Sequence, residues 1–143
     1  MSSSAYPQNL MLKQLELESK PEVIHSVEVF LEEISNELSF KEDVYANVMV
    51  AVTEAVNNSI LHGNKEDPDK KVLLHVHMEN QYRLKITVSD EGEGFDPGGL
   101  ADPTAPENIE NIGGRGVFLM RHLADDLSFS DDGRTVIMVC LLY

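Results

Sequence analysis

Apolar residues alternate with polar ones in five short segments of the chain, which is the two-residue period of a half-buried β-strand. These segments are residues 13–18, 72–78, 84–88, 127–130 and 135–142. Asn80 and Gln81 separate the second segment from the third, and Asp131, Asp132 and Gly133 separate the last two. Because such polar and glycine-containing stretches favour tight turns, we expect two hairpins.

Three other segments repeat apolar residues at helical spacing, and they are residues 19–38, 39–63 and 116–124. The first two begin with a capping-box pattern, Ser19 with Glu22 and Ser39 with Glu42, in which side chains satisfy free amides at the helix start. Two long helices, one shorter helix and about five strands predict a two-layer α/β sandwich of the α+β class. In this fold the helices cover one face of the sheet.

Between residues 91 and 114 the apolar period disappears, and glycine and proline accumulate. A stretch of that length without periodicity inside a compact domain is typically a functional loop. We therefore expect a lid over a ligand site, between the third strand and the last helix.

The length and composition are those of one globular domain. The chain has 143 residues, a mass of 15.9 kDa and 42% hydrophobic residues, which is enough for one core. Residues 1–9 carry no charged side chain and no periodic pattern. We expect them to form a disordered tail before a single domain over residues 10–143.

The charge balance is strongly acidic, since 11 Lys and Arg stand against 25 Asp and Glu and leave a net charge of -14. This charge repels nucleic-acid phosphates and anionic lipids, which argues against a nucleic acid or a membrane surface as partner. The longest uncharged apolar run, residues 48–52, is far below the roughly 20 residues that span a bilayer. Residues 1–9 contain no Lys or Arg, whereas a secretory signal begins with basic residues. We expect a cytoplasmic protein.

The single cysteine, Cys140, lies in an apolar run, so we assign it to the core. His75 and His77 lie on one strand face and could chelate a metal. Because no third ligand is evident in the sequence, a solvated sheet face is the simpler interpretation.

Glu54, Asn58 and His62 are four residues apart and share one helix face. A solvated polar face is the usual explanation of such a set. His62 lies near the expected C-terminus of this helix, where a positive charge is stabilising, and a contact with a phosphate is the alternative explanation. Asp90 shifts the balance towards a site, because it ends a strand and precedes Gly92 and Gly94, which permit close approach of a ligand to the backbone.

Gly113, Gly114 and Gly116 precede the last helix, where free amide groups and the helix dipole can receive phosphate oxygens. The chain has neither a P-loop lysine pattern nor a strand-linked G-x-G-x-x-G pattern. A calcium loop is also excluded, because Gly92 and Gly94 stand where that loop needs side-chain oxygens.

Taken in order, three segments resemble the ATP-binding domain of gyrase, heat-shock chaperones, histidine kinases and mismatch-repair ATPases, the GHKL superfamily. They are residues 54–63 (EAVNNSILHG), 90–96 (DEGEGFD) and 113–120 (GGRGVFLM). Within this superfamily the chain is most similar to the anti-sigma-factor serine kinases, over nearly the whole domain. The resemblance implies a mixed, mostly antiparallel sheet, with ATP bound between the helices and the lid.

The same resemblance implies a role for individual residues. Glu54 resembles the catalytic carboxylate, which would act as general base on a hydroxyl. Asn58 resembles the ligand of a Mg²⁺ ion held together with the triphosphate. Asp90 resembles the carboxylate that accepts a hydrogen bond from the exocyclic amine of adenine. Gly92 and Gly94 resemble the glycines beside the base.

Gly114 and Gly116 resemble the glycines over the phosphates. Two positions depart from the family pattern. Ile112 stands where the sporulation-type kinases have Arg, which leaves Arg115 as the candidate cationic contact to the phosphates. The last hairpin carries Thr135 in a variant of the Gly-Thr pair, as a further candidate contact.

The resemblance implies a homodimeric protein-serine kinase that uses ATP and Mg²⁺. Its expected partners are a sigma factor or similar protein and an antagonist of the anti-anti-sigma type, which it would phosphorylate. The alternative is a nucleotide-dependent protein-binding module without significant kinase activity. A histidine-kinase catalytic domain ranks third, because residues 1–20 offer no dimerisation helix with a phosphoacceptor.

Overall fold

The computed structural model describes residues 12–92, 114–130 and 133–142 of the chain. The tail expected over residues 1–9 and most of the expected lid lie outside these residues. None of the helices in the described part is long and apolar enough to cross a membrane.

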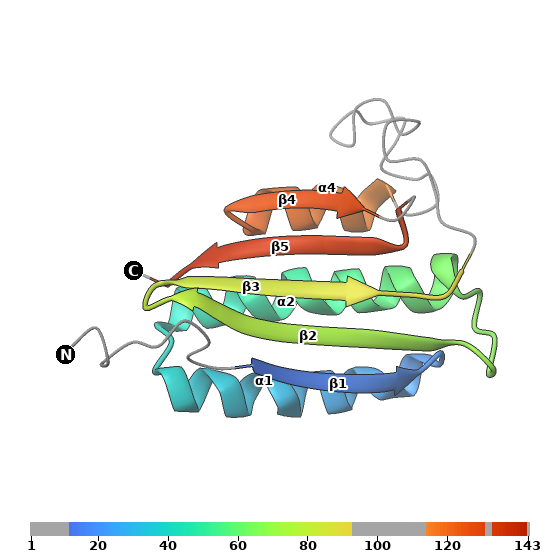
Figure 1. Cartoon of the computed structure of the whole chain (residues 1–143), viewed down its shortest axis with the longest axis horizontal. Helices are drawn as coiled ribbons and strands as arrows, with labels where there is room; N and C mark the ends of the chain where they lie inside the picture. The colour runs from blue at the N-terminus through green and yellow to red at the C-terminus, as the bar shows by residue number, and fades with distance from the viewer. Residues whose placement is uncertain (1–11, 93–113, 131–132, 143) are drawn as a thin grey trace.

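Five strands form a single sheet in the spatial order β1-β2-β3-β5-β4 (Figure 1). They are β1 (Leu12–Glu18), β2 (Lys71–Asn80), β3 (Arg83–Ser89), β4 (Asp126–Ser130) and β5 (Thr135–Leu141). The two expected hairpins are β2–β3 and β4–β5. All four pairings are antiparallel, so the parallel pairing that a mixed sheet requires does not occur among the described strands.

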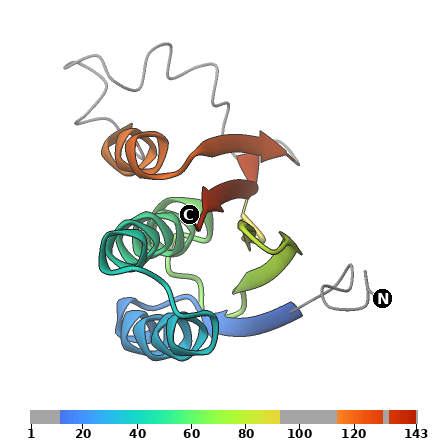
Figure 2. The same ribbon diagram turned by 90° about the vertical axis from the view of Figure 1, so that its left-hand side faces the viewer.

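Three α-helices of the described chain cover one face of this sheet, which gives the two-layer α+β sandwich that the sequence predicts (Figure 2). They are α1 (Ile24–Leu38), α2 (Glu42–Asn58) and α4 (Gly114–Leu123). A 3₁₀ turn, η1 (Pro21–Val23), leads into α1, and a π-helical turn, η2 (Ser59–Gly63), follows α2.

The core lies between the helices and the sheet, and it explains why the two periods in the sequence were informative. On β2 the buried residues are every second one, and they face the apolar sides of α1 and α2. The fully buried side chains include Leu31, Ile34, Val52, Leu74 and Ile86. Cys140 is also buried, as predicted.

Both expected capping boxes are wrong, because tertiary contacts use the two serines differently. Ser19 is 3% exposed, and its hydroxyl donates to the carbonyl of Lys70 instead of a helix amide. Ser39 has a left-handed backbone, with φ of 54°, and ends α1. The N-terminal flanking residue of α2 is Lys41, which makes no side-chain cap.

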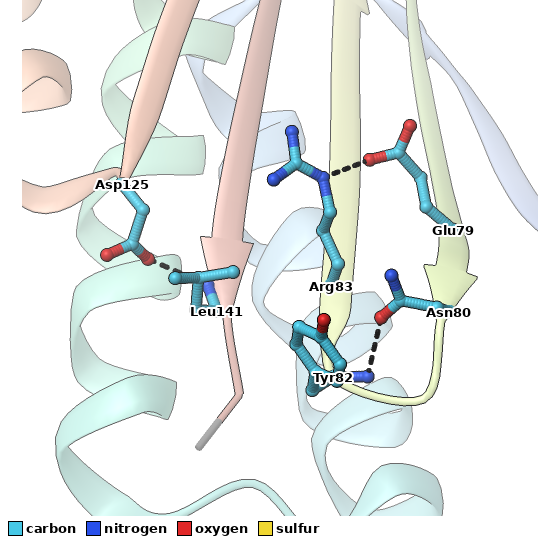
Figure 3. Close-up of polar contacts among 6 residues, drawn as sticks. All are labelled: Glu79, Asn80, Tyr82, Arg83, Asp125 and Leu141. Atoms are coloured by element: carbon cyan, nitrogen blue, oxygen red, sulfur yellow. Dashed lines mark hydrogen bonds and ion pairs between the residues drawn. The ribbon is translucent and has the colours of Figure 1, made fainter.

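Polar contacts close the end of the sheet that carries the β2–β3 turn (Figure 3). Glu79 Oε1 accepts from Arg83 Nε at 2.6 Å across the hairpin. Asp125, just before β4, accepts from the amide of Leu141 at 2.7 Å. These contacts tie the strand ends together at this end and leave the opposite end for the candidate site.

Candidate functional site

Figure 1 shows the end of the sheet where β3 stops and β5 begins. A pocket near this end is lined by side chains from α2, β4, α4 and the residues around the ends of β3 and β5. The polar side chains of this pocket include Asn58, Asp90 and Arg134. Apolar side chains, among them Val88 and Met120, form its inner wall. The enclosed space is about 10 Å³, which holds about one water molecule.

Hydrogen bonds to the backbone hold Asp90 in place directly after β3. Its amide donates to the carbonyl of Arg134 at 2.9 Å, which continues the pairing between β3 and β5 beyond the last strand residue. Its Oδ1 accepts from the amide of Gly92 at 2.8 Å, the local side-chain turn that Asp favours. The guanidinium of Arg134 donates to the carbonyl of Gly92 at 3.2 Å. The carboxylate therefore sits in a turn that is fixed on two sides.

Two glycines allow this turn to pack against the end of α2. A Cβ on Gly92 would overlap the carbonyl of Gly63, and a Cβ on Gly63 would overlap the carboxylate of Asp90. Gly92 was expected to allow close approach of a ligand. Gly63 was predicted only as the end of a helix, because nothing in the local sequence reveals a contact with a distant carboxylate.

The π-turn η2 brings Gly63 to Asp90. Its wider ring is closed by the amide of Asn64, which donates to the carbonyl of Ser59 at 2.7 Å. Single π-turns inside or at the end of α-helices occur frequently at functional sites. Here the turn ends the predicted helix at Gly63, as expected, but its geometry has no signature in the hydrophobic period.

The structure brings only some of the expected site residues together. Asn58, the last residue of α2, lines the same pocket as Asp90. Glu54 lies one helical turn earlier on the same face of α2 and is half-buried, but it is not among the lining residues. His62 is exposed in η2.

Thr135 begins β5, and its hydroxyl lies 3.1 Å from that of Ser89. These two side chains occupy the sheet face opposite Val88 and Val136, which line the pocket. Arg134 also lines the pocket, although it is not among the predicted site residues. Its position between Gly133 and Thr135 is the one signal in the sequence that points to it.

The phosphate-side candidates are described only in part. The backbone of Gly114, Arg115 and Gly116 forms the first turn of α4. This helix begins near the end of the sheet where β3 stops (Figure 1). The side chain of Arg115 and the whole of Gly94 lie outside the described residues. Their roles remain predictions.

The chemistry of these groups suits a nucleotide with a divalent ion, although the enclosed space itself is only the size of a water molecule. A carboxylate held between glycines can accept from an exocyclic amine, and an amide oxygen such as that of Asn58 is a suitable donor to Mg²⁺. Within the described residues, no group of three or more His, Cys, Asp or Glu side chains is arranged to hold a metal ion.

Most of the chain matches a known family of ATP-binding domains. Residues 17–140 match the model of the histidine kinase-like ATPase domain, and the chain belongs to this family. Its relatives include the serine-protein kinase RsbW of Listeria innocua, 30% identical over 131 residues that cover 87% of this chain and 83% of that protein. RsbW of Bacillus cereus is 29% identical over 132 residues, covering 87% of this chain and 81% of that protein.

Two solved structures share the fold. The RsbU and RsbW domains of a Mycobacterium tuberculosis protein align with a TM-score of 0.60 and 14% identity, over 92% of this chain and 32% of that one. The histidine kinase domain of a blue-light activated kinase from Erythrobacter litoralis aligns with a TM-score of 0.52 and 17% identity, over 85% of this chain and 59% of that one. The likeness confirms the expected architecture.

Proposed function

We propose that the protein is an ATP-dependent protein-serine kinase of the anti-sigma-factor type. The observation that carries the proposal is the carboxylate of Asp90, fixed between Gly63 and Gly92 in the pocket that Asn58 also lines. Membership of the histidine kinase-like ATPase family and homology to serine-protein kinases support it. The proposed partners are a sigma factor or similar protein and the antagonist that is phosphorylated. We also propose a cytoplasmic homodimer.

In the proposed reaction, Asp90 accepts from the exocyclic amine of adenine, and Asn58 holds Mg²⁺. The ion, when bound, neutralises charge on the triphosphate. Glu54 takes the proton from a serine hydroxyl of the partner while the serine oxygen bonds to the γ-phosphorus. The bond between that phosphorus and the β–γ bridging oxygen breaks, and ADP leaves. The two side chains on α2 therefore have separate tasks, since one holds the ion and the other moves the proton.

Substitutions on α2 test this division. Glu54→Gln should keep ATP affinity, because the adenine and metal contacts belong to other residues. Phosphate transfer should fall by about a hundredfold to ten-thousandfold, the usual loss when a positioned base is removed. Asn58→Ala should weaken both Mg²⁺-dependent ATP binding and transfer. Calorimetry measures the affinity, and phosphoserine on co-purified partners measures the transfer.

The position of Glu54 outside the pocket lining favours a second candidate, a nucleotide-dependent protein-binding module without significant kinase activity. The same preparation separates the two functions. A wild-type protein that binds its partner only with ATP, but transfers no phosphate to it, would establish the module. Loss of ATP binding in Glu54→Gln would make Glu54 a residue of the binding pocket and remove it as the base.

A further inference from the structure

We infer that Asn64 is a positioning residue for base recognition, whose side-chain amide holds the Asp90–Gly92 turn in the conformation that reads adenine. The inference rests on the proposed ATP binding. Asn64 is 1% exposed and directly follows the π-turn that contains Gly63. In the sequence it begins the polar stretch of residues 64–70, whose composition is typical of a loop.

The side-chain amide of Asn64 contacts three separate parts of the chain. Its Nδ2 donates to Ser19 Oγ at 2.8 Å and to the carbonyl of Lys71 at 3.0 Å. Its Oδ1 accepts from the amide of Glu91 at 2.8 Å. One buried side chain therefore links the residue after Asp90 to the end of β1 and the start of β2.

The orientation of this amide is set by its partners. The hydroxyl proton of Ser19 is donated to the carbonyl of Lys70, so Ser19 Oγ acts as an acceptor towards Asn64. The amide of Glu91 can only donate, and the carbonyl of Lys71 can only accept. A side chain with a donor and an acceptor on the same group is required here, and Asn supplies both.

The contact with Glu91 bears directly on Asp90. The amide of Asp90 is bonded to the carbonyl of Arg134, and the amide of Glu91 is bonded to Asn64. Both peptide units of Asp90 are thus anchored, and the amide of Gly92, the next residue but one, bonds to its carboxylate and orients it. Without Asn64 one anchor is lost, while Asn58 keeps its place on α2. We therefore expect base preference to suffer more than the metal contact.

The test compares Asn64→Ala with a matched control, Ser19→Ala. The control removes a buried group of the same network but leaves the bond between Asn64 and Glu91. Affinities for ATP and GTP with Mg²⁺ are measured by calorimetry, well below each melting temperature. Asn64→Ala should lower ATP affinity by about tenfold or more and reduce the ATP-to-GTP affinity ratio by about fivefold or more. Ser19→Ala should change the ratio less than about twofold.

A second measurement needs no nucleotide. Hydrogen exchange of the Glu91 amide should accelerate in Asn64→Ala and stay near the wild-type rate in Ser19→Ala. Should Asn64→Ala not fold, Asn64→Ser gives the same test, because its shorter side chain does not reach the amide of Glu91.

The outcomes separate the inference from the proposed function. A wild-type protein that binds neither nucleotide refutes the proposed function and, with it, the role of Asn64 in base reading. If the wild-type protein prefers ATP and Asn64→Ala keeps the same affinity ratio, only the inference is refuted. An equal loss of the ratio in both variants would also refute it, since the effect would then follow general damage to the network.

Discussion

At the scale of single residues, the candidate site depends on side chains that are absent as much as on those present. The carboxylate of Asp90 occupies space that a methyl group on Gly63 would fill, and the carbonyl of Gly63 occupies space that one on Gly92 would fill. Gly92 could be predicted because it follows a strand and an acidic residue. Gly63 could not, because its partner is far away in the sequence.

Replacing Gly63 by Ala should weaken ATP binding by about tenfold or more, because the added carbon displaces the Asp90 carboxylate, the proposed reader of the base. The backbone of Gly63 is not in the left-handed region, so the effect should come from the clash rather than from helix geometry. Calorimetry gives the affinity. Leu61→Ala is the matched control, since Leu61 belongs to the same π-turn and is 39% exposed. Equal affinities in the two variants would contradict the assigned role.

At the scale of elements, the sequence predicted every described strand and the three helices, because burial on one face imposes a period that the sequence displays. The sequence did not predict the positions of side chains whose hydrogen-bond partners are distant in the chain. Ser19 was assigned to a helix cap, but its hydroxyl bonds to Lys70. Asn64 resembled a loop residue, although it is buried. Local patterns carry no information about such long-range hydrogen bonds.

Packing of α1 on the sheet provides a test at this scale. Leu31 is 2% exposed, whereas Val29 on the same helix is 46% exposed. Leu31→Ala should lower the free energy of unfolding by about 2–5 kcal/mol, because it removes buried methyl groups and leaves a cavity. Val29→Ala should change it by less than about 0.5 kcal/mol. Urea unfolding followed by circular dichroism measures both free energies of unfolding. Similar losses in the two variants would contradict the orientation of α1, in which Leu31 faces the sheet and Val29 faces solvent.

At the scale of the whole molecule, the family resemblance indicates candidate site residues but not how they face one another. Asn58 and Asp90 lie in one pocket, as expected. Thr135 shares the opposite sheet face with Ser89, and Glu54 is outside the lining. The order of motifs along a chain does not determine on which side of a strand, or how deep, each side chain lies. Those positions depend on strand register and on the turn after α2.

Cys140 reports on the integrity of the whole core. Burial away from water, and secondly the charge of Asp125, raise the pKa of its thiol from 9.0 to about 11. Between pH 9 and about pH 11 the folded protein therefore keeps this proton, whereas the unfolded chain loses it. The resulting stability is present below pH 9 and is lost as pH rises towards 11. Alkylation at pH 8 should be slow in the folded protein and should follow global unfolding in urea. Rapid alkylation without urea would contradict the burial.

The turn between β2 and β3 lies at one end of β3, and Asp90 directly follows the other end, at the opposite end of the sheet (Figure 1). The amide of Tyr82 donates to Asn80 Oδ1 at 3.0 Å (Figure 3). Gln81 between them is exposed. A fluorophore or surface tether attached through Gln81→Cys would therefore leave the end of the molecule that carries the candidate site facing solvent. Because the natural thiol is shielded, the attachment would be selective without first removing it. Immobilised protein could then be used to follow partner capture in real time.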